Sequence, residues 1–228
     1  MLISVLIPCY NEKNSIEEIV SRINNLTDLE IEIIIIDDYS NDGTREILKD
    51  KIKDKVSKII FNEANFGKGY SLKKGIEAAN GEIILIQDAD LEYNPKEYYK
   101  LTKPIMDGNA EVVYGSRFIG GDERRILFFW HTVANKLLTL LSNMFTNLNL
   151  TDMETCYKVF KREIIKKIKL EEKGFGFDPE VTAKIAKLKP KIYEVGISYF
   201  GRTYEEGKKI GLKDAFIVLK CIIIYNLF

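Results

Sequence analysis

Residues 82–92 read Glu82-Ile83-Ile84-Leu85-Ile86-Gln87-Asp88-Ala89-Asp90-Leu91-Glu92, a hydrophobic run that leads into three alternating carboxylates. The first six residues have the length and composition of a buried β-strand. If the chain stays extended beyond them, side chains alternate between faces, and Asp88, Asp90 and Glu92 project to one side. Three carboxylates there repel one another unless a cation lies between them, and Mg²⁺ or Mn²⁺ takes oxygen ligands of this kind. The other interpretation is a solvated acidic turn that closes a strand.

The composition narrows the class of protein. A chain of 228 residues with 46% hydrophobic residues is long enough for one sizeable core. Lys plus Arg and Asp plus Glu number 34 each, so the overall charge gives no reason to expect a nucleic-acid partner. Cys9, Cys156 and Cys221 are odd in number and lack C-x-x-C spacing, which favours buried thiols in a reducing compartment over a disulfide framework.

The two ends of the sequence bear on its location. Met1 leads directly into an expected strand without a basic leader, so we expect no signal peptide. The apolar stretch 215–228 is interrupted by Lys220 and is too short to cross a bilayer. We therefore expect a cytoplasmic protein that is either soluble or peripheral, in the second case at the cytoplasmic face of the membrane.

Strands and helices alternate along the first half of the chain. Near-continuous Ile/Val runs alternating with amphipathic helical patterns predict an α/β fold, in which helices cover both faces of a mostly parallel central sheet. We expect strands at 3–7, 31–36, 58–61, 82–87 and 112–114, and helices at 13–26, from 42 onward, at 69–79, at 95–106, at 126–141 and at the C-terminus.

A polar, non-periodic cluster follows each expected strand. Ligands of open parallel sheets bind beyond the carboxyl ends of the strands, so these clusters should converge on one cleft. Taken singly, each cluster is also ordinary turn chemistry. The clusters are Pro8-Cys9-Tyr10-Asn11-Glu12, Asp37-Asp38-Tyr39-Ser40, residues 62–69, the acidic stretch 88–92 and Gly115-Ser116-Arg117.

Four of these motifs together closely resemble family 2 glycosyltransferases of the GT-A fold. The motifs are residues 7–12, 36–44, 65–69 and 87–90. The second half, with Thr151-Asp152-Met153-Glu154-Thr155-Cys156-Tyr157-Lys158-Val159-Phe160 and Gly201-Arg202-Thr203-Tyr204, is similar to the polyprenyl-phosphate sugar synthases, relatives of dolichyl-phosphate mannosyltransferases. The resemblance implies one Rossmann-like GT-A domain over 1–228, with a nucleotide-sugar half at 1–118 and an acceptor half with a mobile loop at 119–228.

The resemblance also implies an activity. It is the metal-dependent, inverting transfer of a hexose-type sugar from a UDP- or GDP-sugar to a polyprenyl phosphate. Asp88, Asp90 and Glu92 would hold Mg²⁺ or Mn²⁺ against the diphosphate, although many relatives have Gln at the position of Glu92. Asp38 would accept hydrogen bonds from base N–H groups, and the other interpretation of Asp38 is a capping or turn residue. The implied nucleotide-binding positions are Pro8, Tyr10, Glu12, Asp38, Lys68, Asp88, Arg202 and Lys209.

Cations near the C-terminus complete the implied donor site. Arg202 and Lys209 lie in a segment rich in charge and glycine that suits a loop closing over bound nucleotide. Their separation is one residue longer than in relatives, which leaves Lys208 open as the contact instead. A solvated basic linker before the last helix is the alternative.

On the acceptor side, the resemblance implies that Arg117 contacts the lipid phosphate, for which a planar guanidinium is well suited. His131, Asn135 and Lys136 are further candidates for the acceptor, although a lone histidine on an apolar helix is more often packed. Glu180, with Asp178 before it, lies where family members carry a general base. An ionised phosphate acceptor needs no strong base, and a carboxylate in the first turn of a helix is also explained by the helix dipole.

The apolar helix at 126–141 and the last helix, each with basic residues nearby, fit an interfacial membrane contact. A homodimer interface or a packed core gives the same pattern. Two other functions stay open on the sequence alone: a transferase with a soluble glycan or protein hydroxyl acceptor, and a non-catalytic nucleotide-sugar-binding protein. The intact Asp88-Ala89-Asp90 argues against the second of these.

Overall fold

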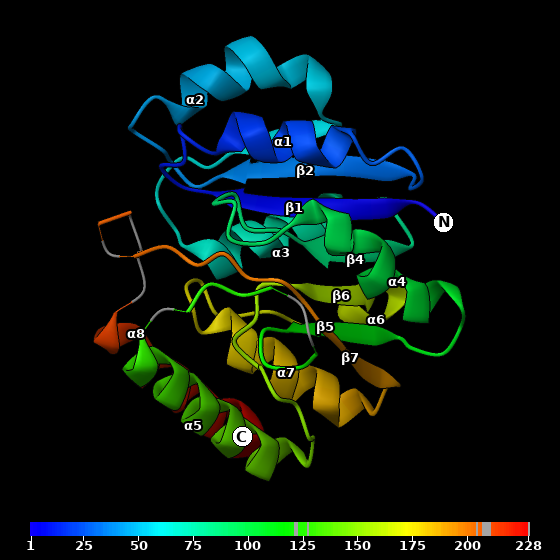
Figure 1. The fold of residues 1–228 in the computed structure, drawn as a ribbon, viewed down its shortest axis with the longest axis vertical. Coiled ribbons are helices and arrows are strands. Elements are labelled where there is room, and N and C mark those ends of the chain that lie inside the picture. The colour runs from blue at the N-terminus through cyan, green and yellow to red at the C-terminus, as the bar shows by residue number, and fades with distance from the viewer. Residues whose placement is uncertain (121–122, 127, 204, 207–210, 228) are drawn as a thin grey trace.

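The computed structural model describes residues 1–120, 123–126, 128–203, 205–206 and 211–227 (Figure 1). These residues form one α/β domain around a seven-stranded sheet with the order β3-β2-β1-β4-β6-β5-β7. β6 runs antiparallel to its neighbours β4 and β5, and the remaining pairs are parallel. The strands are β1 (Ile3–Cys9), β2 (Ile31–Asp37), β3 (Lys58–Phe61), β4 (Ile83–Ile86), β5 (Val112–Ser116), β6 (Lys158–Lys161) and β7 (Ile192–Gly196).

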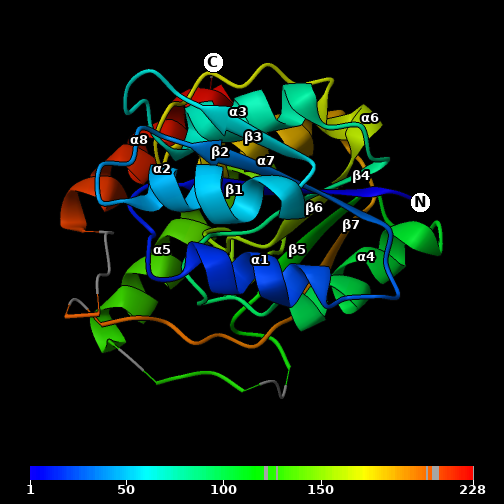
Figure 2. The ribbon, with the colours of Figure 1, turned by 90° about the horizontal axis from the view of Figure 1, so that it is seen from above.

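The isoleucine-rich strands form the centre of the sheet because both of their faces are covered. β1 pairs with β2 from Ile3 opposite Ile31 to Cys9 opposite Asp37, and on its other side Ile3 lies opposite Ile83 of β4. Nearly every residue of these three strands is buried. Figure 2 shows α1 and α4 on one side of the sheet and α3 on the other. The expected mostly parallel sheet with helices on both faces is confirmed.

The α-helices are accompanied by short helical turns. α5, α7 and α8 pack against one another and form one end of the molecule in Figure 1. Short π-helical and 3₁₀ turns cover Leu48–Ile52, Lys53–Lys55 and Pro95–Glu97. The α-helices are α1 (Ile16–Asn24), α2 (Thr44–Ile47), α3 (Lys68–Ala78), α4 (Tyr98–Met106), α5 (Phe129–Thr146), α6 (Arg162–Ile165), α7 (Phe177–Leu188) and α8 (Leu212–Leu227). Within the described ranges, no helix combines the length and the hydrophobicity needed to cross a bilayer.

The acidic stretch departs from the expectation of an extended chain. β4 ends at Ile86, and the residues after it form turns, with Leu91 in the left-handed region at a φ of 63°. A left-handed residue reverses the local direction of the chain. The prediction that Asp88, Asp90 and Glu92 alternate along one extended strand is therefore wrong. Side chains from other elements decide where these carboxylates lie.

Candidate functional site

The carboxyl ends of β1, β2, β4 and β5 lie at one edge of the sheet, and the expected polar clusters follow them there. Residues just before the antiparallel strand β6 enter the same edge, between the ends of β4 and β5. A cavity of about 330 Å³ opens at this edge. It is lined by Asn11, Glu12, Lys13, Asn14, Ser15, Asp42, Asp90, Leu91, Arg202 and Glu206.

Arg202 is the centre of the donor-side cluster. Its Nη2 lies 2.8 Å from Asp90 Oδ2, its Nε lies 3.2 Å from Glu92 Oε1, and its Nη1 lies 3.6 Å from Glu12 Oε2. The backbone N–H of Arg202 also donates to Glu92 Oε1 at 2.9 Å. Tyr199 donates from its hydroxyl to the other oxygen of Glu92 at 2.8 Å. The structure thus brings three carboxylates from two strand ends onto one guanidinium.

Asp88 has a different partner. Its Oδ1 lies 2.7 Å from Nζ of Lys68, the first residue of α3. Burial alone would lower the pKa of Lys68, but the charge of Asp88 outweighs it and raises that pKa. The loop before Lys68 needs glycine: Gly67 has a φ of 99°, and a Cβ there would lie 2.4 Å from the carbonyl oxygen of Lys173.

The carboxylates fit a divalent cation by their chemistry. Burial raises the pKa of Asp90 to about 7, with Asp88 and Glu92 adding to the rise and Arg202 opposing it. This excess of negative charge is what a cation would relieve. In the part of the chain that the structure describes, no three acidic, histidine or cysteine side chains are grouped closely enough to hold a metal ion by themselves. Mg²⁺ commonly takes only one or two carboxylates, with waters and substrate phosphates as the other ligands.

Asp38 organises the loop that leads to Lys68. Its Oδ1 accepts from Asn62 Nδ2 at 2.8 Å and from the Phe66 N–H at 3.0 Å, and its Oδ2 accepts from the Gly67 N–H at 2.7 Å. Asp38 is also buried. This geometry matches the turn interpretation of Asp38, because both oxygens already have partners within the protein.

Three further residues expected to bind the nucleotide lie at the end of β1 or just after it. Pro8 lies within that strand, Tyr10 is exposed just beyond it, and Glu12 is buried beside Arg202. Lys208 and Lys209, expected to contact nucleotide, lie outside the described residues. The donor-side residues that the structure brings together are therefore Glu12, Asp90, Glu92 and Arg202, next to the pair of Lys68 and Asp88.

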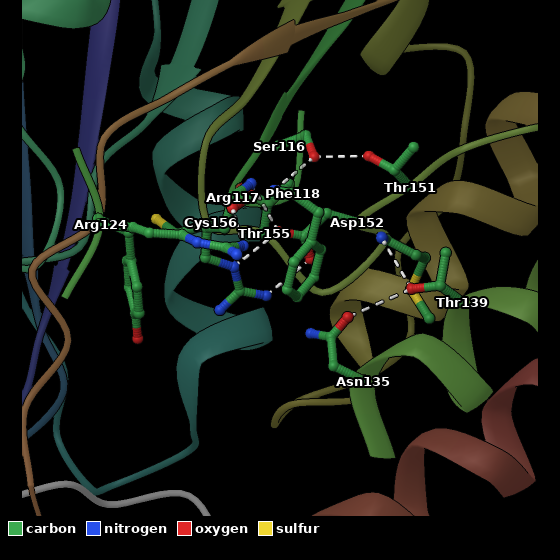
Figure 3. Close-up of polar contacts among 12 residues, drawn as sticks. Ser116, Arg117, Phe118, Arg124, Asn135, Thr139, Thr151, Asp152, Thr155 and Cys156 are labelled. Carbon is green, nitrogen blue, oxygen red and sulfur yellow. Dashed lines mark hydrogen bonds and ion pairs between the residues drawn. The ribbon is translucent and has the colours of Figure 1, made fainter. Parts of the chain in front are cut away.

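Arg117 forms the acceptor-side cluster with Asp152 (Figure 3). Its Nε and Nη2 lie 2.6 and 2.7 Å from the two oxygens of Asp152, and its backbone N–H donates to Asp152 Oδ2 at 3.1 Å. Ser116 Oγ lies 2.6 Å from Thr151 Oγ1 beside this pair. The guanidinium also lies 5.2 Å from the ring centre of Tyr199. Because Tyr199 bonds Glu92, one aromatic ring separates Arg117 from the donor-side cluster.

The expected acceptor residues on α5 differ in their surroundings. Lys136 Nζ lies 5.7 Å from the ring centre of Phe118, which also lies 5.8 Å from the guanidinium of Arg117, so Lys136 is near the acceptor-side cluster. Asn135 accepts from Thr139 Oγ1 at 3.4 Å (Figure 3). The ring of His131 lies 5.1 Å from that of Phe128, as expected for a packed histidine.

Glu180 has a scaffold role in this arrangement. It is fully buried in α7, and its two oxygens accept from the backbone N–H groups of Glu171 and Glu172 at 2.7 and 2.8 Å. Lys184 Nζ lies 2.6 Å from the first of these oxygens. Glu180 therefore holds a loop, and this geometry gives it no access to a substrate proton. Asp178 is paired with the buried Lys158.

Asp152, Tyr199 and the pair of Lys158 and Asp178 are site residues that were not predicted from the sequence. A signal for Asp152 and Lys158 was present, because both lie in the quoted motif 151–160. No local pattern marks Tyr199, whose partner Glu92 is 107 residues away in sequence.

Comparisons with known proteins show the family of this chain. Residues 4–169 match the model of Glycosyl transferase family 2. The chain is 27% identical over 215 residues to a dolichol-phosphate mannosyltransferase of Pyrococcus furiosus, covering 92% of this chain and 61% of that protein. It is 27% identical over 212 residues to an undecaprenyl-phosphate 4-deoxy-4-formamido-L-arabinose transferase of Aeromonas hydrophila, covering 91% of this chain and 62% of that protein. The chain thus spans less than two thirds of both.

A third relative is closer to this chain in length. It is an undecaprenyl-phosphate mannosyltransferase of Micrococcus luteus, 26% identical over 223 residues, covering 92% of this chain and 88% of that protein. Among solved structures, glucosyl-3-phosphoglycerate synthase from Mycobacterium tuberculosis, in complex with Mn²⁺, UDP and glucosyl-3-phosphoglycerate, superposes with a TM-score of 0.76. That match covers 99% of this chain and 80% of the other at 19% identity, which supports the fold alone. The expected GT-A fold is confirmed.

Proposed function

Because the chain belongs to glycosyl transferase family 2, we propose that it transfers a hexose-type sugar from a UDP- or GDP-sugar to a polyprenyl phosphate. One observation carries the proposal. A carboxylate cluster suited to a metal-bound diphosphate and a cation suited to a second phosphate lie at the same sheet edge, linked through Tyr199. A reaction between two phosphate-bearing substrates needs a site for each phosphate group, and the two sites must lie side by side.

On the donor side, Asp90 is the residue that would hold Mg²⁺ or Mn²⁺, with Asp88 and Glu92 as its neighbours. The bound ion would act as a Lewis acid that neutralises charge on the leaving nucleoside diphosphate. Arg202 lies on the same carboxylates, so it is placed to add positive charge as the diphosphate leaves. Lys209 is proposed as a second cation from the resemblance alone.

The proposed base-binding wall is Pro8, Tyr10 and Glu12, next to the cavity at the end of β1. Asp38 would contribute to this site by fixing the loop 62–67. It accepts a hydrogen bond from the N–H of Gly67, the residue directly before Lys68. Lys68 then neutralises Asp88 at the side of the donor phosphates. The proposed donor half is 1–118 and the proposed acceptor half is 119–228, except that Arg202 reaches the donor side from the second half and Arg117 reaches the acceptor side from the first.

On the acceptor side, two of the five N–H groups of the Arg117 guanidinium donate to Asp152, and the other three have no hydrogen-bond partner among the residues that the structure describes. These three would hold the acceptor phosphate, with Lys136 nearby. One phosphate oxygen then attacks the anomeric carbon, the bond to the diphosphate breaks, and the electron pair leaves with the diphosphate. The configuration inverts. A phosphate monoester is largely ionised near neutral pH, with a second pKa of about 6, so no general base is required. The buried position of Glu180 is consistent with this.

The acceptor class rests on the relatives as well. The three curated relatives carry names that specify dolichol phosphate or undecaprenyl phosphate. The match covers 61% and 62% of the first two. We therefore propose the lipid phosphate as the acceptor without proposing which sugar is moved.

Peripheral membrane contact is part of the proposal. α5 and α8 pack together and expose large apolar side chains, with Phe129 at 69%, Trp130 at 75% and Phe216 at 73% exposure. The exposed cations Arg124 and Arg125 lie just before α5. Apolar faces with basic neighbours bind the interface of anionic bilayers, where a lipid phosphate is presented. A homodimer through these helices is the competing explanation.

The test is a panel of radiolabelled UDP- and GDP-sugars incubated with extracted polyprenyl phosphates and Mg²⁺ or Mn²⁺. We expect label in the lipid phase for one donor, and loss of that label when the metal is chelated. Transfer to a soluble hydroxyl acceptor, with none to any polyprenyl phosphate, would promote the soluble-acceptor alternative. Mn²⁺-dependent binding of UDP or GDP without any turnover would instead indicate a sensor.

A further inference from the structure

Residues 152–157 lie between the donor and acceptor clusters. They precede β6, which runs antiparallel between β4 and β5, so they lie beside the carboxyl ends of both strands. At one end of this segment Asp152 holds Arg117, and at the other the Cys156 N–H donates to Tyr93 Oη at 3.2 Å. Glu154 is midway along it. The proposed reaction would take place at this point of the sheet edge.

Two neighbouring side chains of this segment carry buried oxygen atoms without a partner. Among the described residues, neither Glu154 Oε1 nor Thr155 Oγ1 has a hydrogen-bond partner, although both atoms are inaccessible to solvent. Native proteins leave few buried polar atoms without a partner, because each such atom destabilises the fold. Two adjacent cases at the centre of a site indicate a place that a ligand completes.

The charges around Glu154 are already balanced without it. Arg117, from the end of β5, is paired with Asp152, and Lys158 of β6 is paired with Asp178 of α7. Both cations attract an ionised Glu154, whereas both carboxylates repel it. Because each cation already has its own carboxylate, a third carboxylate adds a negative charge that nothing compensates.

The protonation state follows from this balance. Burial raises the pKa of Glu154 to about 8, Asp178 and Asp152 add to the rise, and Lys158 and Arg117 oppose it. Glu154 is therefore mainly neutral at pH 7, and a neutral carboxyl group has one O–H to donate. A phosphate arriving at Arg117 brings further negative charge, which favours the neutral form still more.

We propose that Glu154 contacts the acceptor, donating a hydrogen bond from its neutral carboxyl group to a phosphate oxygen of the lipid that Arg117 holds. Thr155, the next residue in the chain, carries the other buried oxygen without a partner and is proposed as a second donor to the same phosphate. This inference rests on the proposed function and adds a residue for which the resemblance implied no role. It differs from general base catalysis, because the carboxyl group keeps its proton throughout the reaction.

The experiment compares wild type with Glu154→Gln, which retains a donor at every pH. The matched control is Glu163→Gln, an exposed position on α6. For wild type, we expect acceptor kcat/KM to fall above pH 8, where the group ionises, while the donor KM stays constant. The fall should be about tenfold per pH unit for a single ionisation. Glu154→Gln should keep acceptor kcat/KM within about threefold at pH 7 and lose the alkaline fall, because one hydrogen bond replaces another.

Three results would overturn the assignment. If the acceptor kcat/KM of Glu154→Gln still falls above pH 8, another group causes that fall. If Glu154→Gln lowers the acceptor kcat/KM by about a hundredfold or more at every pH, Glu154 acts as a base. The third result comes from infrared spectroscopy at pH 7 without substrates, which detects the C=O stretching band of protonated carboxyl groups. The assignment fails if this band is the same in wild type and in Glu154→Gln. If wild type transfers sugar to no polyprenyl phosphate, the proposed function fails and this inference fails with it. In the other cases wild-type transfer persists, so the two failures are distinguishable.

Discussion

Replacing Arg117 with alanine should lower the free energy of unfolding and should also weaken acceptor binding, and the structure gives a magnitude for each effect. Asp152 is fully buried and the Arg117 side chain is 16% exposed, so the substitution leaves a buried carboxylate without its cation. Breaking a buried ion pair in this way costs about 3–5 kcal/mol of the free energy of unfolding. For a chain of this size the melting temperature should fall by about 6–20 °C.

The effect on acceptor binding follows from the guanidinium N–H groups of Arg117 that do not donate to Asp152 and that are proposed to hold the phosphate. Loss of charge-assisted hydrogen bonds totalling about 3 kcal/mol should raise the acceptor KM about a hundredfold. The donor KM should change by less than about threefold, because the carboxylates around Arg202 are untouched. The assay is steady-state transfer with each substrate varied in turn, well below the lowered melting temperature.

A double variant separates the two effects. Adding Asp152→Asn to Arg117→Ala removes the unpaired charge, so most of the lost stability should return while the acceptor KM stays high. An equal rise in both Michaelis constants would refute an acceptor role for Arg117. So would recovery of the acceptor KM together with stability, since Arg117 would then act only through the fold.

Three further predictions concern other carboxylates. Asp90→Asn should lower turnover at least about a hundredfold with Mg²⁺ or Mn²⁺ present while the melting temperature stays within a few degrees; normal turnover would remove Asp90 from the metal site. Asp38→Ala should lower the free energy of unfolding by about 1–3 kcal/mol, measured with urea, because the loop N–H groups up to Gly67 lose their acceptor. Unchanged stability together with weaker nucleotide binding would return Asp38 to reading the base. The hydrogen bonds of Ser4, Asn80 and Gly81 outweigh the burial of Glu32 and lower its pKa, so its contribution is present above its unfolded pKa and is lost as pH falls through the folded value. Glu32→Gln should therefore be less stable than wild type at pH 7, and the difference should shrink as pH falls below the unfolded pKa of Glu32. A difference in the free energy of unfolding that stays constant with pH would contradict this.

The strands that were predictable are those whose burial is visible in their own sequence. β1, β2 and β4 are rich in isoleucine, valine and leucine because both faces are covered. β6 and β7 were not predicted. In β6, the buried Lys158 is paired with Asp178 of α7, and β7 is a half-exposed edge strand. Both strands depend on partners distant in sequence, which a local hydrophobic pattern does not reveal.

The candidate site shows the same limit. Glu12, Asp90 and Arg202 were expected from motifs after strands or in the C-terminal segment, and the structure brings them together. Asp38 was expected to bind the nucleotide base and Glu180 to lie where relatives carry a general base, but the oxygens of both accept mainly from backbone N–H groups of this chain. The sequence shows which carboxylates lie at the ends of strands and helices. Whether such a carboxylate binds a substrate or holds a loop depends on which backbone N–H groups lie near its oxygens in the folded protein.

The most direct test of the central claim is a competition between two lipids of equal chain length. The full chain is incubated with the sugar donor, Mg²⁺ or Mn²⁺, and equal amounts of a polyprenyl phosphate and the corresponding polyprenol, and the lipid products are identified by mass spectrometry. Because Arg117 is proposed to select the acceptor by its phosphate, we expect the sugar only on the polyprenyl phosphate. Glycosylated polyprenol, in amounts equal to or above the phosphate product, would contradict the account.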